Sequence, residues 1–156
     1  MTNTWFNVKV KYTKQFDDGR IGRVSEQILV DALSFTEAES RSYKEMLENL
    51  AGESSIEAIQ KKNISDIFGY DDGDQWYSAI LEFVSSDADS GREKKVKHEM
   101  YLNADNLEQA HLRLQDSVKD MIVSYQIKSI KETKVVEVFP YVPEKVEEEN
   151  ANEEEN

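Results

Sequence analysis

Two tryptophans and the lysines around them are the residues of this sequence with the most informative chemistry. Trp5 precedes Lys9 and Lys11 in the stretch WFNVKVKY, and Trp76 opens the similar stretch WYSAILEF. Aromatic rings stack on unpaired nucleobases, at roughly 1 to 3 kcal/mol per base, while lysine ammonium groups contact phosphates. Together these residue types favour binding of a single-stranded nucleic acid, provided that one exposed surface carries both.

The spacing of the apolar residues after Trp5 predicts a β-strand. Phe6, Val8, Val10 and Tyr12 recur at every second position, which is the period of a strand with one buried face. Trp5 and the lysines that follow it then lie on the opposite face. The same parity places residues of other predicted strands on that face, namely Leu29, Trp76, Ile80 and Tyr101.

An internal repeat explains why the two tryptophans stand in similar surroundings. The stretch IQKKNISDIF (59–68) returns as IKETKVVEVF (130–139), and WFNVKVKY and WYSAILEF are related by the same shift of seventy-one positions. ILVDALSFTEAE (28–39) matches MYLNADNLEQAH (100–111) at a shift of seventy-two. Three related stretches in the same order indicate that the chain arose by internal duplication.

Each half predicts the same order of elements, which is strand, strand, helix and strand. FDDGRIG supplies turn residues between the first two strands. Ser34 with Glu37 predicts a helix N-cap, as does Asp105 or Asn106 in the second half, and Gly52 is expected to end the first helix. The helices' apolar sides comprise Ala38, Met46, Leu47 and Leu50, and then Leu107, Ala110, Leu114, Val118 and Met121. The closing strand of each half is expected to be bent or bulged in its middle.

These elements predict an α+β fold. A helix with one apolar side needs a sheet to cover, so we expect two helices on one face of a sheet of about six strands. Residues 1–143 are expected to form a single folded domain made of two repeats, at about 4–69 and 75–141. Residues 144–156, EKVEEENANEEEN, predict a disordered acidic tail.

The formal net charge of −13, averaged over the whole chain, argues against nucleic-acid binding. The excess of acidic residues is, however, concentrated in two stretches of the chain. The predicted tail holds seven acids and one lysine, and residues 66–89 hold seven acids without a lysine or arginine. The remainder is balanced, and it includes the cationic stretches RIGRVSE, REKKVKH and IKSIKETK. An acidic tail can compete with phosphate for a cationic groove, and once displaced it can recruit other proteins.

The sequence gives no indication of catalysis, of a metal site or of a cofactor. It has no cysteine, no glycine-rich phosphate loop, and no serine in the context of an activated nucleophile. His98 and His111 belong to different predicted elements, and YDDGDQW (70–76) has its glycine too early for a calcium loop. We therefore predict a protein that is not an enzyme.

The N-terminal stretch MTNTWFNVKVKYTK alternates polar and apolar residues. It lacks the uninterrupted apolar run of a signal peptide or a membrane span. We expect a cytoplasmic protein that does not contact membranes.

Four stretches, WFNVKVKY, LVDALSFTEAE, GDQWY and VFPY, resemble a family of short proteins of unknown function from Bacteroidetes and their crAss-like phages. The resemblance covers residues 4–141. It implies a candidate phage single-stranded DNA-binding protein, and phage proteins of that functional class often end in an acidic tail.

The sequence thus predicts a single-stranded DNA-binding protein of replication or recombination, which recruits replication proteins through its tail. The predicted nucleic-acid contacts are Trp5, Lys9, Lys11, Trp76, Lys94, Lys95, Lys97, Tyr101, Lys128 and Lys131. One alternative is a protein-binding adaptor, or an inhibitor that imitates DNA towards a basic partner protein. Another alternative is that the tryptophans pack under a loop or between copies of the chain, and in the second case the protein would be a homo-oligomer.

Overall fold

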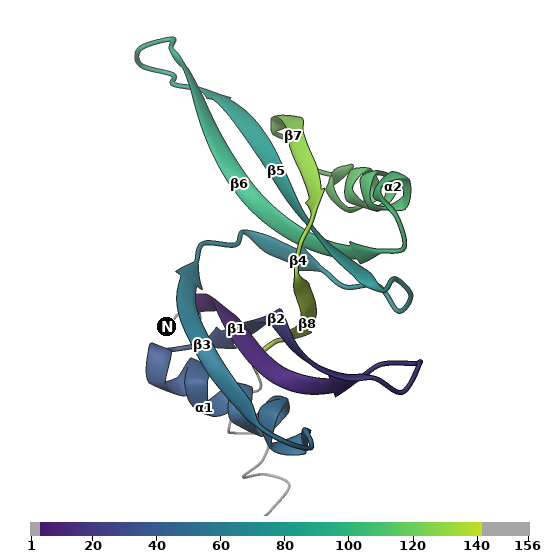
Figure 1. Ribbon diagram of the computed structural model, residues 1–156. Helices are drawn as coiled ribbons and strands as arrows, with labels where there is room; N and C mark the ends of the chain where they lie inside the picture. Colours follow the sequence, from purple (N-terminus) through teal and green to yellow (C-terminus); the bar gives the residue numbers. More distant parts are fainter. Residues whose placement is uncertain (1–3, 142–156) are drawn as a thin grey trace, which may run out of the picture. The chain divides into compact units, whose positions relative to one another are not determined.

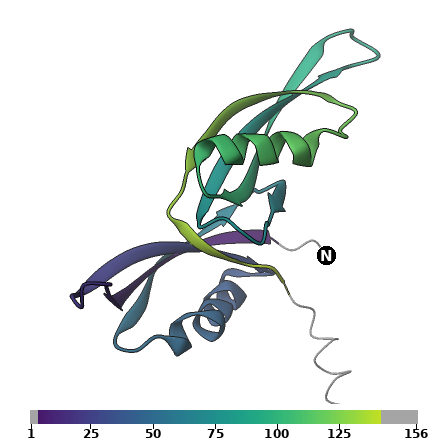
Figure 2. The same ribbon diagram turned by 90° about the vertical axis from the view of Figure 1, so that its right-hand side faces the viewer.

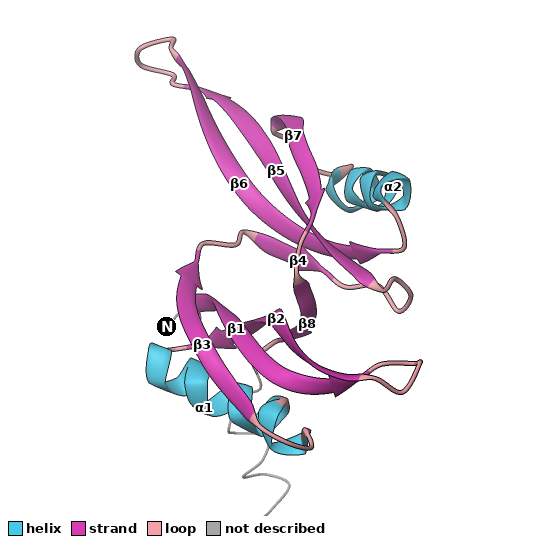
Figure 3. Ribbon diagram, in the orientation of Figure 1, coloured by secondary structure: helices cyan, strands magenta, loops and turns pink. Residues whose placement is uncertain are grey.

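The computed structural model describes residues 4–141, which divide into two compact units (Figure 1). Unit 1 comprises residues 4–61 and 137–141, and unit 2 comprises residues 62–136. Each unit contains a four-stranded sheet and one long helix, coloured by type in Figure 3. The predicted tail at 144–156 lies outside the described residues.

Unit 1 has the strand order β3-β1-β2-β8. Its long hairpin is formed by β1 and β2, which pair antiparallel along their whole length. The elements of its sheet and helical region are β1 (Thr4–Gln15), β2 (Ile21–Ala32), α1 (Phe35–Glu45), the 3₁₀ turn η1 (Leu47–Asn49), β3 (Ser54–Lys62) and β8 (Val135–Phe139).

Unit 2 has the strand order β4-β6-β5-β7, with β4 parallel to β6 and the other neighbours antiparallel. Its elements are β4 (Asp66–Phe68), β5 (Gln75–Ser86), β6 (Glu93–Ala104), α2 (Leu107–Val118) and β7 (Ser124–Glu132). Ile80 pairs with Ser129 and Leu81 with Ile127, so Lys128 is the extra residue of a bulge. The predicted irregularity in the closing strand is confirmed here.

The predicted single sheet of about six strands is wrong, because the closing element of each half breaks into two strands. The first piece stays with its own half, as β3 or β7, and the second piece joins the sheet of the other half. Thus β4 from the first repeat borders β6, and β8 from the second repeat borders β2. Each helix lies along one face of its own sheet, as Figure 2 shows, so the expectation of helices on one face holds for each sheet separately.

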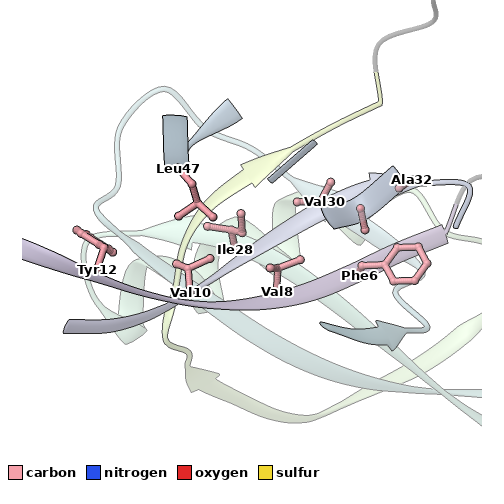
Figure 4. Packing of buried hydrophobic residues seen from close by; sticks show 9 residues of the cluster. Phe6, Val8, Val10, Tyr12, Ile28, Val30, Ala32 and Leu47 are labelled. Carbon is pink, nitrogen blue, oxygen red and sulfur yellow. The ribbon is translucent and has the colours of Figure 1, made fainter. Parts of the chain in front are cut away.

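The core of unit 1 follows from the alternation in β1 (Figure 4). Phe6, Val8 and Val10 are at most 2% exposed, and the antiparallel register places Val30 opposite Phe6 and Ile28 opposite Val8. Ala38 of α1 and Leu47 of η1 close the other side of this layer. Tyr12 belongs to the same cluster, so the predicted parity of the first strand is confirmed.

The core of unit 2 repeats this arrangement. Its members are Tyr77, Ala79 and Leu81 of β5, Met100, Leu102 and Ala104 of β6, and Ala110, Leu114 and Val118 of α2. Leu107 and Met121 were also predicted for the apolar side of the helix, but they are 54% and 37% exposed. Leu107 is the first residue of α2 and Met121 lies beyond its last residue, so neither is held against the sheet.

The predicted helix N-caps are confirmed. Ser34 Oγ accepts a hydrogen bond from the Glu37 amide at 3.1 Å, and Asn106 Oδ1 accepts one from the Gln109 amide at 2.8 Å. The expected end of the first helix at Gly52 is wrong, since α1 ends at Glu45 and the tighter turn η1 follows. This turn brings Leu47 into the core, where it is 3% exposed.

Candidate nucleic-acid interface

Within residues 4–141, the sheet of unit 1 has one face that no helix covers, which we call helix-free face 1. Residues that are paired across an antiparallel ladder lie on the same side of the sheet. Because the core residues of β1 face the helix, the intervening residues of β1 and their partners on β2 form helix-free face 1: Trp5, Asn7, Lys9, Lys11, Thr13, Arg23, Ser25, Gln27, Leu29 and Asp31.

Helix-free face 2 is the corresponding surface of unit 2. By the same argument it contains Trp76, Ser78, Ile80, Glu82, Val84 and Ser86 of β5, and Glu93, Lys95, Lys97, Glu99, Tyr101 and Asn103 of β6. On β7, Lys131 stands opposite Ser78. Lys94 pairs with Ser85 and therefore lies on the helix side, so the sequence argument grouped it with the wrong face.

The lysines of helix-free face 1 converge on one carboxylate. Lys9 Nζ and Lys11 Nζ each lie 3.8 Å from the Glu57 carboxylate on β3, and the side chains of both lysines remain over 40% exposed. Exposed ion pairs of this kind contribute little to stability, and their cations stay available to a ligand. Arg23 adds a third cation, 3.6 Å from Glu53.

A polar network covers the middle of helix-free face 2. Lys62 Nζ donates to the Tyr101 hydroxyl at 2.7 Å and lies 3.3 Å from the Glu99 carboxylate, which also accepts a bond from Ser78 at 2.6 Å. Burial alone would lower the pKa of Lys62, but the hydrogen bond to Tyr101 and the charge of Glu99 outweigh burial and raise it. Tyr101 has the predicted orientation but is only 2% exposed, so its ring is not available for stacking.

The outer part of helix-free face 2 is cationic and exposed. Lys95 and Lys97 are exposed on β6, while Lys128 lies 3.7 Å from Glu82 and keeps 42% of its side chain exposed. Lysines outnumber carboxylates on this face, with Lys62, Lys95, Lys97, Lys128 and Lys131 against Glu82, Glu93 and Glu99.

Trp5 and Trp76 occupy equivalent positions near the start of β1 and β5. Each lies on a helix-free face and is half-buried, with Asp31 opposite Trp5 and Asn103 opposite Trp76. The Trp76 carbonyl accepts hydrogen bonds from the amide and the hydroxyl of Thr133, at 3.0 and 2.9 Å. The backbone around Trp76 is therefore fixed, while its ring keeps partial access to solvent.

Among the hollows of unit 2 are two lined largely by residues outside helix-free face 2. One, of about 470 Å³, lies between α2 and β7 and is lined by residues that include Leu107, His111 and Ile130. The other, of about 460 Å³, is lined by Phe83, Met100 and Met121 among others. At its rim Ser65 Oγ lies 2.6 Å from His98 Nδ1, a contact that sequence reasoning missed because the two residues are far apart in the chain.

The part of the chain that the structure describes holds no group of three or more histidine, aspartate or glutamate side chains suited to a metal ion. Within the same residues, neither helix is long and apolar enough to cross a membrane.

Comparison with known protein families matches residues 4–141 to a family described as Domain of unknown function (DUF4494). The chain belongs to this family. Curated proteins and solved structures give no match. The DUF4494 description names no activity, so the functional argument depends on the two helix-free faces.

Sequence reasoning missed three polar residues that organise the DUF4494 fold. Lys62 was not among the predicted cations, because it ends a strand whose face could not be assigned. Arg41 and Arg113 were also missed, although they are seventy-two positions apart, which is the shift that relates the two helices. That shift was the signal that could have identified them as an equivalent pair.

Proposed function

We propose that this protein is a non-enzymatic single-stranded DNA-binding protein that uses its helix-free faces. The observation that carries the proposal is the composition of those faces. Each has a half-buried tryptophan together with exposed lysines, Lys9 and Lys11 on one face and Lys95 and Lys97 on the other, in a chain whose formal net charge is −13. Cations that gather where a molecule is otherwise acidic favour a polyanionic ligand.

The tryptophans favour a single strand over a duplex. Stacking requires a base whose ring face is free, and a paired base in a duplex does not offer one. Trp5 and Trp76 would each receive one base, and the neighbouring lysines would hold the phosphates. The proposed phosphate contacts are Lys9, Lys11, Lys95, Lys97, Lys128 and Lys131. Lys94 and Tyr101 are left out, because Lys94 lies on the helix side and Tyr101 is buried.

The acidic tail is proposed to regulate this binding. Its seven acids can occupy the lysines of a helix-free face when no DNA is present, and once released they can recruit replication proteins. A chain that ends at Pro143 should then bind DNA more tightly than the full-length chain.

The test is fluorescence anisotropy of a labelled oligothymidine, titrated with the full-length chain at about 50 and 200 mM salt. With the six proposed phosphate contacts, affinity should fall about 300-fold between these two concentrations. Lys95→Gln with Lys97→Gln should weaken binding and reduce the slope of log affinity against log salt by about 1.4, because each contact contributes about 0.7.

The matched control is Lys44→Gln with Lys94→Gln, which removes the same total charge from the helix side of the two sheets. Its binding should stay close to that of the unmodified chain. Equal loss from both double variants would show that net charge and not the face determines binding, and it would overturn the proposal. If no oligonucleotide binds at low salt, recovery of a basic partner protein that is lost at high salt would favour DNA mimicry instead.

A further inference from the structure

Strands β4 and β8 each join the sheet of the other repeat, and we call the sheet edge that receives such a strand an acceptor site. The acceptor site in unit 2 makes several side-chain contacts with the incoming segment. Strand β4 runs parallel to β6, with Ile67 beside Tyr101 and Phe68 beside Leu102. The Asn103 side chain then pairs with the Tyr70 backbone, accepting from its amide at 2.7 Å and donating to its carbonyl at 2.8 Å. The incoming segment is therefore held as an added strand.

An arginine of α2 holds the end of that segment. The Arg113 guanidinium carbon lies 4.4 Å from the centre of the Tyr70 ring, and its Nη1 donates to the Asn103 carbonyl at 2.9 Å. The Tyr70 hydroxyl lies 2.8 Å from Ser117 Oγ. Arg113 thus binds both the sheet and the tyrosine of the incoming segment.

The acceptor site in unit 1 is built from equivalent residues. Strand β8 borders β2, and Phe139 packs against the core of unit 1. Arg41 of α1 donates to the Asp31 carbonyl and, at 2.9 Å, to the Pro140 carbonyl. Its guanidinium carbon lies 5.9 Å from the centre of the Tyr141 ring.

The two incoming segments share a sequence pattern. IFGY (67–70) and VFPY (138–141) are seventy-one positions apart, and each supplies a β-branched residue, a phenylalanine and a tyrosine at the same spacing. In unit 2 the second repeat forms the acceptor and receives the segment of the first repeat. In unit 1 the first repeat forms the acceptor and receives the segment of the second repeat. Recognition therefore depends on the segment itself and not on which part of the chain precedes it.

We propose that the β2 edge with Arg41 is a peptide-binding site for extended Ile/Val-Phe-Gly/Pro-Tyr segments, and that copies of this chain exchange segment 135–141 through it. The partner is a second copy of the chain. Main-chain pairing to a sheet edge provides affinity, and pockets for alternate side chains provide selectivity. Segment 135–141 is the one that exchanges, because β4 lies between β3 and β5 along the chain, whereas β8 is the last strand among the described residues. Only Thr133 and Lys134 join β8 to β7, and short connections of this kind favour exchange between copies.

A peptide titration tests the recognition site. In the full-length variant Phe139→Ala with Tyr141→Ala, the chain's own segment is weakened and the acceptor is intact. A labelled peptide of residues 133–143 should bind this variant at least ten-fold more tightly than it binds the unmodified chain, in which the site is filled. A peptide of residues 64–72, which carries IFGY, should compete for the same site. Equal binding by a peptide with alanine in place of the phenylalanine and tyrosine would overturn the proposal, as would no binding to a variant that still unfolds cooperatively.

A mixing experiment tests exchange between copies. The variant Arg41→Gln has a weakened acceptor and an intact segment, so it complements the Phe139→Ala and Tyr141→Ala variant. Sedimentation velocity should show a heavier species in the mixture that neither variant forms alone. An unchanged distribution after mixing would overturn exchange. Neither experiment contains DNA, so both outcomes are independent of the proposed function.

Discussion

Lys128 and Glu82 form an ion pair with a distance of 3.7 Å between β7 and β5. At the repeat shift of seventy-one, Lys128 corresponds to Glu57 and Glu82 corresponds to Lys11, which are 3.8 Å apart. The pair is therefore present in both sheets with its charges reversed. The pair occupies the same position in both sheets, whereas the sign of the charge at each position is reversed.

The reversed pair predicts that its members can be exchanged within one sheet. Glu82→Lys and Lys128→Glu should each destabilise unit 2, because each places two like charges side by side. One of the two positions is residue 82, where the side chain is only 11% exposed. The double variant should recover most of the loss, with a coupling free energy of roughly 0.5 to 1 kcal/mol that falls with salt. Urea denaturation of the four proteins measures this coupling, and additive losses would contradict it.

Arg113 should be needed for the stability of unit 2 in a way that lysine cannot replace. It donates to the Asp72 carbonyl and carboxylate at 2.7 Å and stacks on Tyr70, and a lysine has neither the planar fork nor the same ring contact. Arg113→Lys should lower the free energy of unfolding by about 1 to 3 kcal/mol. Arg92→Lys on the exposed β5–β6 turn is the control, expected to change it by less than about 0.5 kcal/mol. Similar urea midpoints for both variants would argue against the role.

Leu114 and Leu112 of α2 give a matched pair for the core of unit 2. Leu114 is fully buried, whereas Leu112 is 59% exposed on the same helix. Leu114→Ala should cost about 2 to 5 kcal/mol through lost burial and a residual cavity, and Leu112→Ala should cost less than about 0.5 kcal/mol. Thermal and urea unfolding check the difference, and comparable losses would mean that the helix does not pack as described.

Stability should fall at alkaline pH because three groups, Tyr12, Lys62 and Tyr77, have raised pKa values in the folded chain. Burial and the hydrogen bond to Glu26 raise the pKa of Tyr12, and the pKa of Lys62 is also raised. A raised pKa stabilises the protonated form, so the contribution is complete below the unfolded pKa of about 10 and is lost as pH rises above it. Tyr12→Phe should make the fall between pH 9 and 11 shallower in urea titrations at each pH. Glu26→Gln, which keeps an acceptor without the charge, should give an intermediate slope. An unchanged slope in Tyr12→Phe would contradict this assignment.

The two tryptophans should report DNA binding directly, because they are the chain's only two and both lie on helix-free faces. Addition of oligothymidine should quench the intrinsic fluorescence, and Trp5→Phe and Trp76→Phe should each retain part of the quenching. Alanine at both positions should weaken binding by roughly 2 to 6 kcal/mol if two bases stack. A rise in the anisotropy of the labelled oligothymidine without quenching of tryptophan fluorescence would mean that DNA binds through phosphate contacts only. That result would contradict the stacking role.

Local features of the fold could be predicted from the sequence. The strand parity at Phe6 and Val8 and the caps at Ser34 and Asn106 depend on residues only a few positions apart, and all were confirmed. The exchange of β4 and β8 could not be predicted, because the residue pattern of a strand indicates which of its faces is buried but not which strand lies beside it.

The candidate site was predictable to a similar degree. Trp5, Lys9 and Lys11 lie on one face because a strand alternates, and this required no knowledge of the neighbours. Lys94 was misplaced because a run of three lysines and a valine does not reveal its parity until the pairing with β5 is known. The burial of Tyr101 depends on tertiary packing and on Lys62, which lies thirty-nine positions away.

The exchange of strands means that the sequence repeat and the folded unit divide the chain differently. Unit 2 is encoded by one uninterrupted stretch, residues 62–136, and that stretch interrupts the gene segment for unit 1. A cut at the boundary between the repeats, near residue 72, would remove β4 from one fragment's sheet and β8 from the other's. Residues 62–136 therefore hold every strand of the unit 2 sheet in one contiguous stretch, whereas neither repeat holds every strand of a sheet.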